Sequence, residues 1–446
     1  MSTAARAKAA VGRLAAAVAV VVIRVATSGR WLLGQRSAEG GGAVDRFAVV
    51  SHAVPPMWSG QAMVLERLLG MLPAEQAVVI ASSRAAPAGL ARNTTVTLPS
   101  EPCEARWSQP GWRATLTVLY RCVLRGWRIA LILRRERCGG VVACTGDLID
   151  LPASMLACRA LRLPLVAYYF DDYVAQWSWA PAAFARSQRF EPLILQTARH
   201  VLVPNERLAA CVAQRSGTRP MIIRNPAWTD EVPELPQAAG DPRAPCRIVY
   251  TGAVYHVNYA AFRCLIASFA ELADVQPELH LYTAQDPAQL AEEGIHGPGV
   301  HLFSHVDPGK AWARQREASI VFMGFAFDDG VAAIVQTSAP GKLGDYLASG
   351  VPILAVAPPG SFLIDYLCEH ACGEVVERLD PHAVALAIRR LAGDAGRRET
   401  LVTNALASAR REFAASVAVK ELLNALGLES RAEPRHEAIE QGAEIE

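Results

Sequence analysis

The sequence predicts an α/β protein with two domains, each built around a parallel sheet. Short apolar runs alternate with longer helical patterns through most of the chain, as expected for buried parallel strands joined by crossover helices. The chain has 446 residues, which exceeds the usual range for one domain. A proline-rich stretch at residues 231–245 interrupts the alternation. This interruption predicts the boundary between the two domains.

The expected strands follow from these apolar runs. Before the boundary they are residues 47–52, 77–81, 141–145, 165–170, 200–203 and 221–224, and after it residues 247–251, 279–283, 301–304, 320–323 and 353–356. A final helical region at residues 380–426 is expected to break near Gly393. The acidic, polar residues 429–446 predict a disordered tail.

The segment Ala339-Pro-Gly-Lys-Leu-Gly-Asp-Tyr-Leu-Ala-Ser-Gly-Val-Pro352 carries the strongest functional signal. It predicts a loop, a short helix after Gly341, and a turn into a buried strand. Lys342 and Asp345 are three residues apart, so they share a helix face. A cation and free amides suit a diphosphate, and a carboxylate can accept hydrogen bonds from ribose hydroxyls. The spacing alone equally fits a proline-initiated helix whose two charges face water.

The pattern Pro-x-Lys-Leu-x-(Glu/Asp)-Tyr-Leu-Ala-x-Gly-x-Pro resembles the nucleotide-sugar loop of group-1 glycosyltransferases of the GT-B fold. Ile248-Val-Tyr-Thr-Gly252 resembles the strand and glycine turn that open their donor domain. Residues 198–208 and 222–226 resemble the end of their acceptor domain. The resemblance covers residues 45–425.

This resemblance implies two Rossmann-like domains with parallel sheets facing a central cleft. Residues 41–235 would form the acceptor-side domain, 236–245 the linker and 246–428 the donor domain. The implied activity moves a sugar from a nucleoside-diphosphate donor to a bacterial polysaccharide or lipid-linked acceptor, with retention of configuration. The donor would be held at Gly252, Gly341, Lys342 and Asp345, and Lys342 would stabilise the leaving diphosphate.

Two departures from the family pattern affect this loop. Thr337 stands where the family carries a glutamate, and Asp345 replaces a second glutamate with a shorter side chain. Both departures leave the sugar selectivity open, and the missing glutamate keeps open a non-catalytic GT-B partner protein. A GT-B nucleotide-sugar epimerase or hydrolase, which would share the donor loop, also stays open.

Two segments of the first domain are candidates for acceptor or phosphate binding. Ser59 and Gly60 precede a helical run and replace the family's double glycine, in a turn where backbone amides can approach a ligand. Asp171 and Asp172 end a buried strand, where open α/β sheets bind ligands. These carboxylates are candidates for catalysis or for orienting an acceptor hydroxyl. In the alternative, one caps the next helix and the other faces solvent.

Composition narrows the class of protein. The formal net charge is +1 and about half the residues are hydrophobic, which excludes a typical nucleic-acid-binding protein. The ten cysteines lack paired metal-ligand spacing, so free thiols in a reducing cytoplasm are expected. We expect no metal and no cofactor, with the nucleotide-sugar as co-substrate.

Two segments that are both basic and apolar are candidates for contact with a membrane surface. Residues 1–36 contain six basic and no acidic residues around the apolar run 14–23, which is too short to span a bilayer. Within the extension 1–40, either an interfacial helix or a disordered segment fits. Arg121, Arg125, Arg128 and Arg135 form a predicted stripe opposite Leu116, Leu119, Val123, Trp127 and Ala130. This helix is expected either to lie on an anionic membrane at its inner, cytoplasmic face, or to be an ordinary crossover helix.

Overall fold

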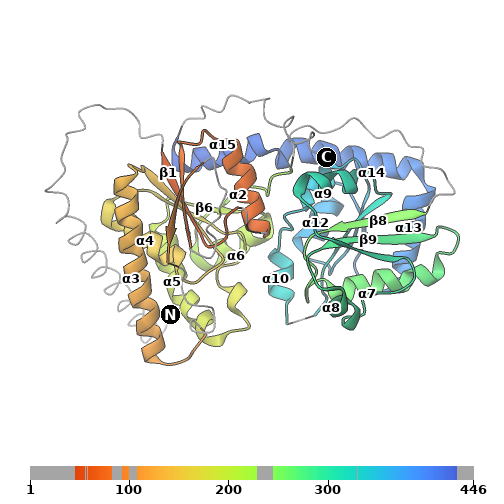
Figure 1. Cartoon of the computed structure of the whole chain (residues 1–446), viewed down its shortest axis with the longest axis horizontal. Coiled ribbons are helices and arrows are strands. Elements are labelled where there is room, and N and C mark those ends of the chain that lie inside the picture. The colour runs from red at the N-terminus through yellow and green to blue at the C-terminus, as the bar shows by residue number, and fades with distance from the viewer. Residues whose placement is uncertain are drawn as a thin grey trace. The chain divides into compact units, whose positions relative to one another are not determined.

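The computed structural model describes residues 46–55, 57, 59–82, 93–99, 108–228, 245–328 and 330–428. The predicted N-terminal extension, nearly all of the predicted linker and the predicted tail lie outside these residues. The chain divides into two compact units (Figure 1). The described residues of the first lie within Met1–Pro204, Ala209–Ile223 and Ala418–Glu446, and those of the second within Asn205–Leu208 and Arg224–Val417.

The first unit contains a parallel sheet of seven strands in the order β3-β2-β1-β4-β5-β6-β7. This order places a topological switch point between β1 and β4, where ligands bind in open α/β sheets. The strands are β1 (Phe47–Ser51), β2 (Ala77–Ser82), β3 (Thr94–Leu98), β4 (Gly140–Cys144), β5 (Leu165–Tyr168), β6 (His200–Val203) and β7 (Met221–Ile222).

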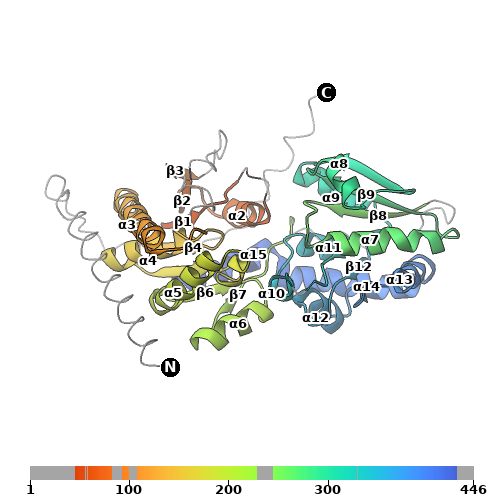
Figure 2. The same ribbon diagram turned by 90° about the horizontal axis from the view of Figure 1, so that it is seen from below.

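Helices cover this sheet because its central strands are buried on both faces. The helices are α2 (Gly60–Gly70), α3 (Trp112–Arg135), α4 (Asp150–Leu161), the short 3-10 turn η4 (Ala175–Trp177), α5 (Pro181–Thr197) and α6 (Glu206–Ser216). In both views α3 runs beside α4, and the two helices pack together (Figures 1 and 2).

The second unit contains a parallel sheet of six strands in the order β10-β9-β8-β11-β12-β13. Its switch point lies between β8 and β11. The strands are β8 (Cys246–Thr251), β9 (Pro277–Thr283), β10 (Val300–Ser304), β11 (Ile320–Gly324), β12 (Ile353–Val356) and β13 (Glu374–Val376). The prediction of two α/β units with parallel sheets is confirmed.

Alternate residues of these strands feed two separate cores, as the two-residue repeat of a strand requires. Ile320 and Phe322 join one core, with α7 and α13, whereas Val321 and Met323 join the other, with α11 and α12. The helices of this unit are α7 (Tyr259–Ser268), η5 (Phe269–Glu271), α8 (Pro287–Glu292), α9 (Pro308–Arg316), α10 (Ala332–Thr337), α11 (Leu343–Ala348), α12 (Phe362–Glu369), α13 (Pro381–Gly393) and α14 (Ala395–Ser408).

The final helical region is broken at two places. Asp394 ends α13, and its side chain accepts a hydrogen bond from the Arg397 amide to begin α14, so the break falls next to Gly393 as predicted. The π-helical turn η6 (Ala409–Phe413) and extended residue Ala414 precede α15 (Ala415–Leu426). Residues of α15 pack into the core of the first unit, although the sequence places the whole region in the donor domain.

The predicted arginine stripe of α3 is wrong in one essential respect. Arg125 is 2% exposed and its Nε donates to the Asp150 carboxylate, so it faces the protein. Leu116, expected opposite the stripe, is 55% exposed. None of the helices in the described ranges has the combination of length and apolarity that would carry it across a bilayer.

Candidate functional site

The turn after β8 brings two predicted donor residues together. Gly252 has φ +118°, a backbone conformation that favours glycine, and its amide donates to the Tyr282 carbonyl oxygen at 2.9 Å. A Cβ atom at Gly252 would lie 3.1 Å from Nζ of Lys342. Two residues ninety positions apart in the sequence therefore adjoin at the carboxyl end of a central strand, which is where such sheets bind ligands.

Lys342 is held over an aromatic ring. Its Nζ lies 3.5 Å from the centroid of the Tyr250 ring, within the range of a cation–π contact. Burial lowers the pKa of Lys342 to about 7, and the neighbouring Asp345 carboxylate offsets only part of this effect. An amine in this state gains a proton readily when an anion arrives, because the anion favours the charged form.

Asp345 fastens the loop to the segment that precedes the predicted linker. Its side chain is 7% exposed, and Oδ1 accepts a hydrogen bond from the Trp228 amide at 2.7 Å. A Cβ atom at Gly344 would lie 3.1 Å from the Ala227 nitrogen, so the two backbones approach closely. A ribose hydroxyl bound here would donate to a carboxylate that already accepts a hydrogen bond from the Trp228 amide.

Three further residues of the second unit surround Lys342 or anchor its loop. Gly341 is half-buried directly before it. The buried Tyr346 hydroxyl accepts a hydrogen bond from the Thr251 amide at 3.2 Å and so ties α11 to the end of β8. Thr337, which stands in place of the family glutamate, is buried, and its carbonyl accepts from Asn205 Nδ2 at 2.8 Å.

In the first unit, the two adjacent aspartates have different environments. Asp172 is 5% exposed, accepts from the Val174 and Ala175 amides, and forms a two-pronged ion pair with Arg215. Arg215 also pairs with Glu191 at 2.9 Å. Asp172 therefore has a full set of structural contacts.

Asp171 is exposed in the same segment. Neighbouring protein atoms keep part of the solvent away from its carboxylate, and this desolvation raises the pKa of Asp171 above the ordinary value. The negative charge of Asp172 raises this pKa further. Its exposed carboxylate fits the predicted contact with an acceptor better than that of Asp172.

Sequence reasoning missed a polar group at the switch point of the first sheet. Gly146 has φ +123°, and a Cβ atom there would fall 1.8 Å from Cε1 of His52. The His52 ring therefore occupies space that any side chain at position 146 would need, so this packing requires glycine there. Gln61 Nε2 links the ends of β1 and β4 by donating to Ser51 Oγ at 2.9 Å and to the Thr145 carbonyl at 3.0 Å.

Asp147 lies next to this group and was not among the predicted residues. Its Oδ1 accepts from the Ile149 and Asp150 amides at 3.0 and 2.7 Å and so caps α4. Burial, and secondly the Asp150 charge, raise the pKa of Asp147 to about 7. The available sequence signal was its position two residues after a buried strand at the switch point.

Ser59 and Gly60 form the start of α2. Ser59 Oγ accepts from the Ala62 amide at 3.2 Å, as an N-cap residue does. Apart from its chain neighbours and the backbone of α2 itself, no atom of the described residues lies within 4 Å of a Cβ atom built on Gly60. Local packing therefore does not require glycine at this position, and the predicted ligand contact at both residues stays a prediction.

Comparison with known proteins supports the fold. Neither a protein-family model nor a curated protein matches the sequence significantly. Among solved structures, HepE from Anabaena in complex with UDP and glucose is 14% identical with a TM-score of 0.59, over 86% of this chain and 99% of that one. The glycosyltransferase WaaG, involved in lipopolysaccharide biosynthesis, is 13% identical with a TM-score of 0.56, over 85% and 100%.

The α,α-trehalose-phosphate synthase (UDP-forming) from Burkholderia xenovorans is 12% identical with a TM-score of 0.61, over 85% of this chain and 100% of that one. These alignments span both units of this chain and nearly all of each relative. The chain has the GT-B fold. The fold expected from the donor-loop resemblance is thus confirmed, and the GT-B frame gives the Lys342 loop its place in the second Rossmann-like unit.

Proposed function

We propose that this protein is a glycosyltransferase that moves a sugar from a nucleoside-diphosphate donor to a saccharide or lipid-linked acceptor. The observation that carries the proposal is the position of Lys342 Nζ beside the Gly252 turn, at the carboxyl end of β8. A half-buried amine with a pKa of about 7 suits this role, because the bound diphosphate raises its pKa, and the charged amine then stabilises the negative charge that develops on the leaving group.

The proposed roles follow from the contacts of each residue. Lys342 stabilises charge on the diphosphate, and Gly252 lets the backbone approach the phosphates. Asp345 accepts ribose hydroxyls with the carboxylate that also accepts from Trp228. Asp171 orients an acceptor hydroxyl. Solved relatives were crystallised with UDP or UDP-glucose, so UDP-glucose is the first donor to test. Retention of configuration rests on the donor-loop resemblance.

Turnover tests this function. We expect Lys342→Ala to lower sugar transfer roughly a hundredfold or more, as loss of one preorganised electrostatic group does. The matched control is Lys310→Ala, because Lys310 is an exposed lysine of the same unit. If Lys342→Ala keeps activity within about threefold of wild type, instead of losing it roughly a hundredfold, Lys342 has no role in stabilising the diphosphate.

The same assay separates the other enzyme classes. Hydrolysis or epimerisation of the donor that is unchanged by lipid extract identifies a hydrolase or epimerase. Failure to bind any nucleoside diphosphate identifies a non-catalytic partner protein, for which the replacement of the family glutamate by Thr337 is the supporting observation.

For the acceptor, we propose a lipid-linked molecule reached at the cytoplasmic surface of a membrane. Trp112, Leu116 and Tyr120 are 69%, 55% and 65% exposed. Their spacing of four residues aligns them on one face of α3. Exposed aromatic and aliphatic side chains beside arginines suit the boundary between headgroups and acyl chains.

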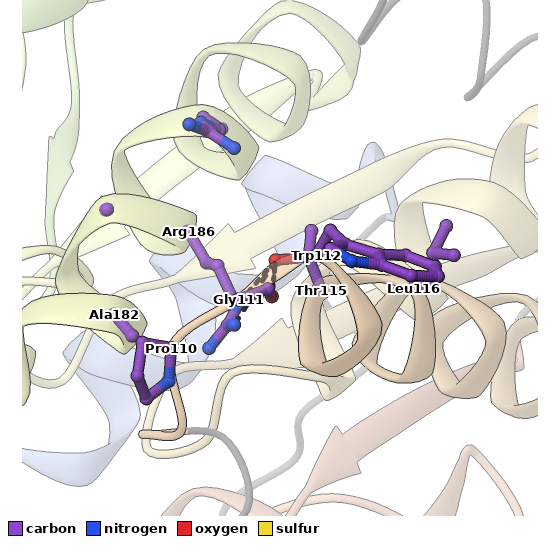
Figure 3. Close-up of a pocket in the computed structure, with 9 residues that line it drawn as sticks. Pro110, Gly111, Trp112, Thr115, Leu116, Ala182 and Arg186 are labelled. Atoms are coloured by element: carbon purple, nitrogen blue, oxygen red, sulfur yellow. Dashed lines mark hydrogen bonds between the residues drawn. The ribbon is translucent and has the colours of Figure 1, made fainter.

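A hollow of about 550 Å³ lies between the start of α3 and α5 and includes Trp112 and Leu116 in its lining. Figure 3 shows Arg186 reaching from α5 toward the first turn of α3. There its guanidinium donates to the Gln109 carbonyl at 2.8 Å and to Thr115 Oγ1 at 3.2 Å. The exposed Arg189 also lines the hollow. The hollow thus combines an exposed cation with apolar walls, which suits a phosphate-bearing lipid.

Liposome co-sedimentation tests this contact. We expect full-length protein to bind anionic vesicles at low salt and to be released at high salt. Removing residues 1–36, or replacing Trp112, Leu116 and Tyr120 with serine, should each weaken binding. Replacing the exposed Leu379 and Leu386 of the other unit with serine is the control for exposed apolar side chains. Equal sedimentation of every variant at every salt concentration would show that neither residues 1–36 nor this face of α3 makes the membrane contact.

A further inference from the structure

Two histidines and a glutamate gather on adjacent strands of the second unit. Glu278 and His280 are two residues apart on β9, so their side chains leave the same face of the sheet. His301 on β10 is the direct partner of His280 in the parallel register. The ligand atoms of all three residues lie within 4.8 Å of one another, and His280 Nε2 lies 3.2 Å from Glu278 Oε2.

The chemistry of this donor set favours a borderline transition metal. Zn²⁺ binds imidazole nitrogens and carboxylate oxygens at about 2.0–2.2 Å, and its tetrahedral ligands lie roughly 3.3 Å apart. Small side-chain rotations therefore bring the three groups into range.

The surroundings define a half-open site. The ring centroid of Phe303 lies 5.3 Å from that of His280 and stacks on Tyr282 at 4.8 Å, which makes one apolar flank. His301 is exposed, so water can reach a fourth position. Arg247 on β8 is the register partner of Glu278. The positive charge of Arg247 would compete with a bound cation for the Glu278 carboxylate.

We propose that Glu278, His280 and His301 bind one divalent transition-metal ion, of which Zn²⁺ fits best, with water as the remaining ligand. The ion would join β10, the edge strand of the sheet, to β9. This role is separate from sugar transfer. It adds a metal site where the cysteine spacing of the sequence predicted none.

Calorimetric titration of tag-free, chelator-dialysed protein with ZnCl₂ tests the site. All proteins carry Cys368→Ser, which removes the one exposed thiol among the described cysteines. We expect one Zn²⁺ per chain, and affinity at least tenfold weaker in His301→Ala and Glu278→Gln. His296→Ala, at an exposed histidine of the same unit, is the matched control and should bind as the parent does.

Thermal melting gives an independent readout. Zn²⁺ at 100 times its dissociation constant should raise the midpoint of the parent and of His296→Ala, because a ligand that binds only the folded state stabilises it. The His301→Ala protein should melt as a single transition and show a smaller shift. Equal Zn²⁺ affinity in the parent and in both site variants, or no binding by the parent, overturns the proposal.

Discussion

The Nζ atom of Lys342 lies 3.5 Å from the centroid of the Tyr250 ring, directly beside the Gly252 turn. The ring replaces part of the water that an ammonium group would otherwise keep. Burial wins over the compensating Asp345 charge, and the pKa of Lys342 falls to about 7. The resting site thus holds an amine that loses its proton far more readily than an exposed lysine does.

Donor binding should take up protons between about pH 7 and pH 9. A diphosphate beside Lys342 stabilises the charged amine and raises its pKa from about 7 toward the ordinary value. Calorimetry with a nucleoside diphosphate at pH 8, in buffers of different ionisation enthalpy, measures this uptake. Wild type should take up a substantial fraction of one proton, and Lys342→Met markedly less. Equal uptake by both proteins would exclude Lys342 as the group that titrates.

Lys342→Met should also preserve or raise stability at pH 7. The lowered folded-state pKa means that the unfolded chain binds more protons between pH 7 and 10.5, so the wild-type lysine opposes folding most at the low end of this window and less as pH rises. A neutral side chain removes this cost. Thermal melting at pH 7 and pH 9.5 measures it. A variant that melts lower than wild type at pH 7 would contradict the burial argument.

Asp345→Asn and Asp345→Ala should separate binding from folding. Asparagine keeps an oxygen that accepts from the Trp228 amide, so stability should change by less than about 1 kcal/mol. Donor affinity should still fall, because an amide cannot accept two hydroxyl hydrogen bonds as a carboxylate can. Alanine leaves the Trp228 amide without this acceptor and should cost about 1–3 kcal/mol in unfolding free energy. Unchanged affinity in Asp345→Asn would limit Asp345 to loop anchoring.

Asp171→Ala and Asp172→Ala should fail in different ways. Loss of Asp172 removes the acceptor of two backbone amides and one partner of Arg215, so we expect a loss of about 2 kcal/mol or more in unfolding free energy. Asp171 is exposed, and its removal should leave the melting temperature nearly unchanged while lowering transfer to acceptor. Wild-type turnover in both variants would refute the acceptor-side assignment.

Gly146→Ala should be far more damaging than Gly60→Ala. At Gly146 the added Cβ meets the His52 ring at 1.8 Å and the backbone has φ +123°, so we expect a cost above about 2 kcal/mol. At Gly60 the Cβ meets no other side chain among the described residues, and alanine should be neutral or stabilising by up to about 1 kcal/mol. Chemical denaturation measures both. Similar stabilities for the two variants would contradict the close packing of His52.

Most central strands could be predicted because parallel strands buried on both faces appear as continuous apolar runs. The runs at 141–145 and 320–323 fall within one residue of β4 and β11. The sequence did not reveal β3, whose Thr94 and Thr97 are exposed at the sheet edge, or β13, which has only three residues. Both strands are recognisable only through their pairing with a neighbour.

The candidate donor site lies on one short segment, the loop from Gly341 to Asp345, which is why the sequence could indicate it; its ligand contacts stay a prediction. Contacts between distant segments were not predictable. The pairing of Arg125 with Asp150 turned a predicted surface arginine inward. The ion pair with Arg215 distinguished Asp172 from Asp171. The apolar face of α15 was visible in the sequence, but a periodic pattern does not state which of two sheets it covers.

Calorimetric titration of wild type, Lys342→Ala and Lys310→Ala with UDP, GDP and ADP tests the central claim most directly. If Lys342 belongs to the donor site, wild type and Lys310→Ala bind at least one of these nucleotides with equal affinity. Lys342→Ala then binds it roughly tenfold or more weakly, as the loss of a charge-assisted contact of about 1.5 kcal/mol or more requires. Affinities of Lys342→Ala and wild type that agree within experimental error would contradict the account.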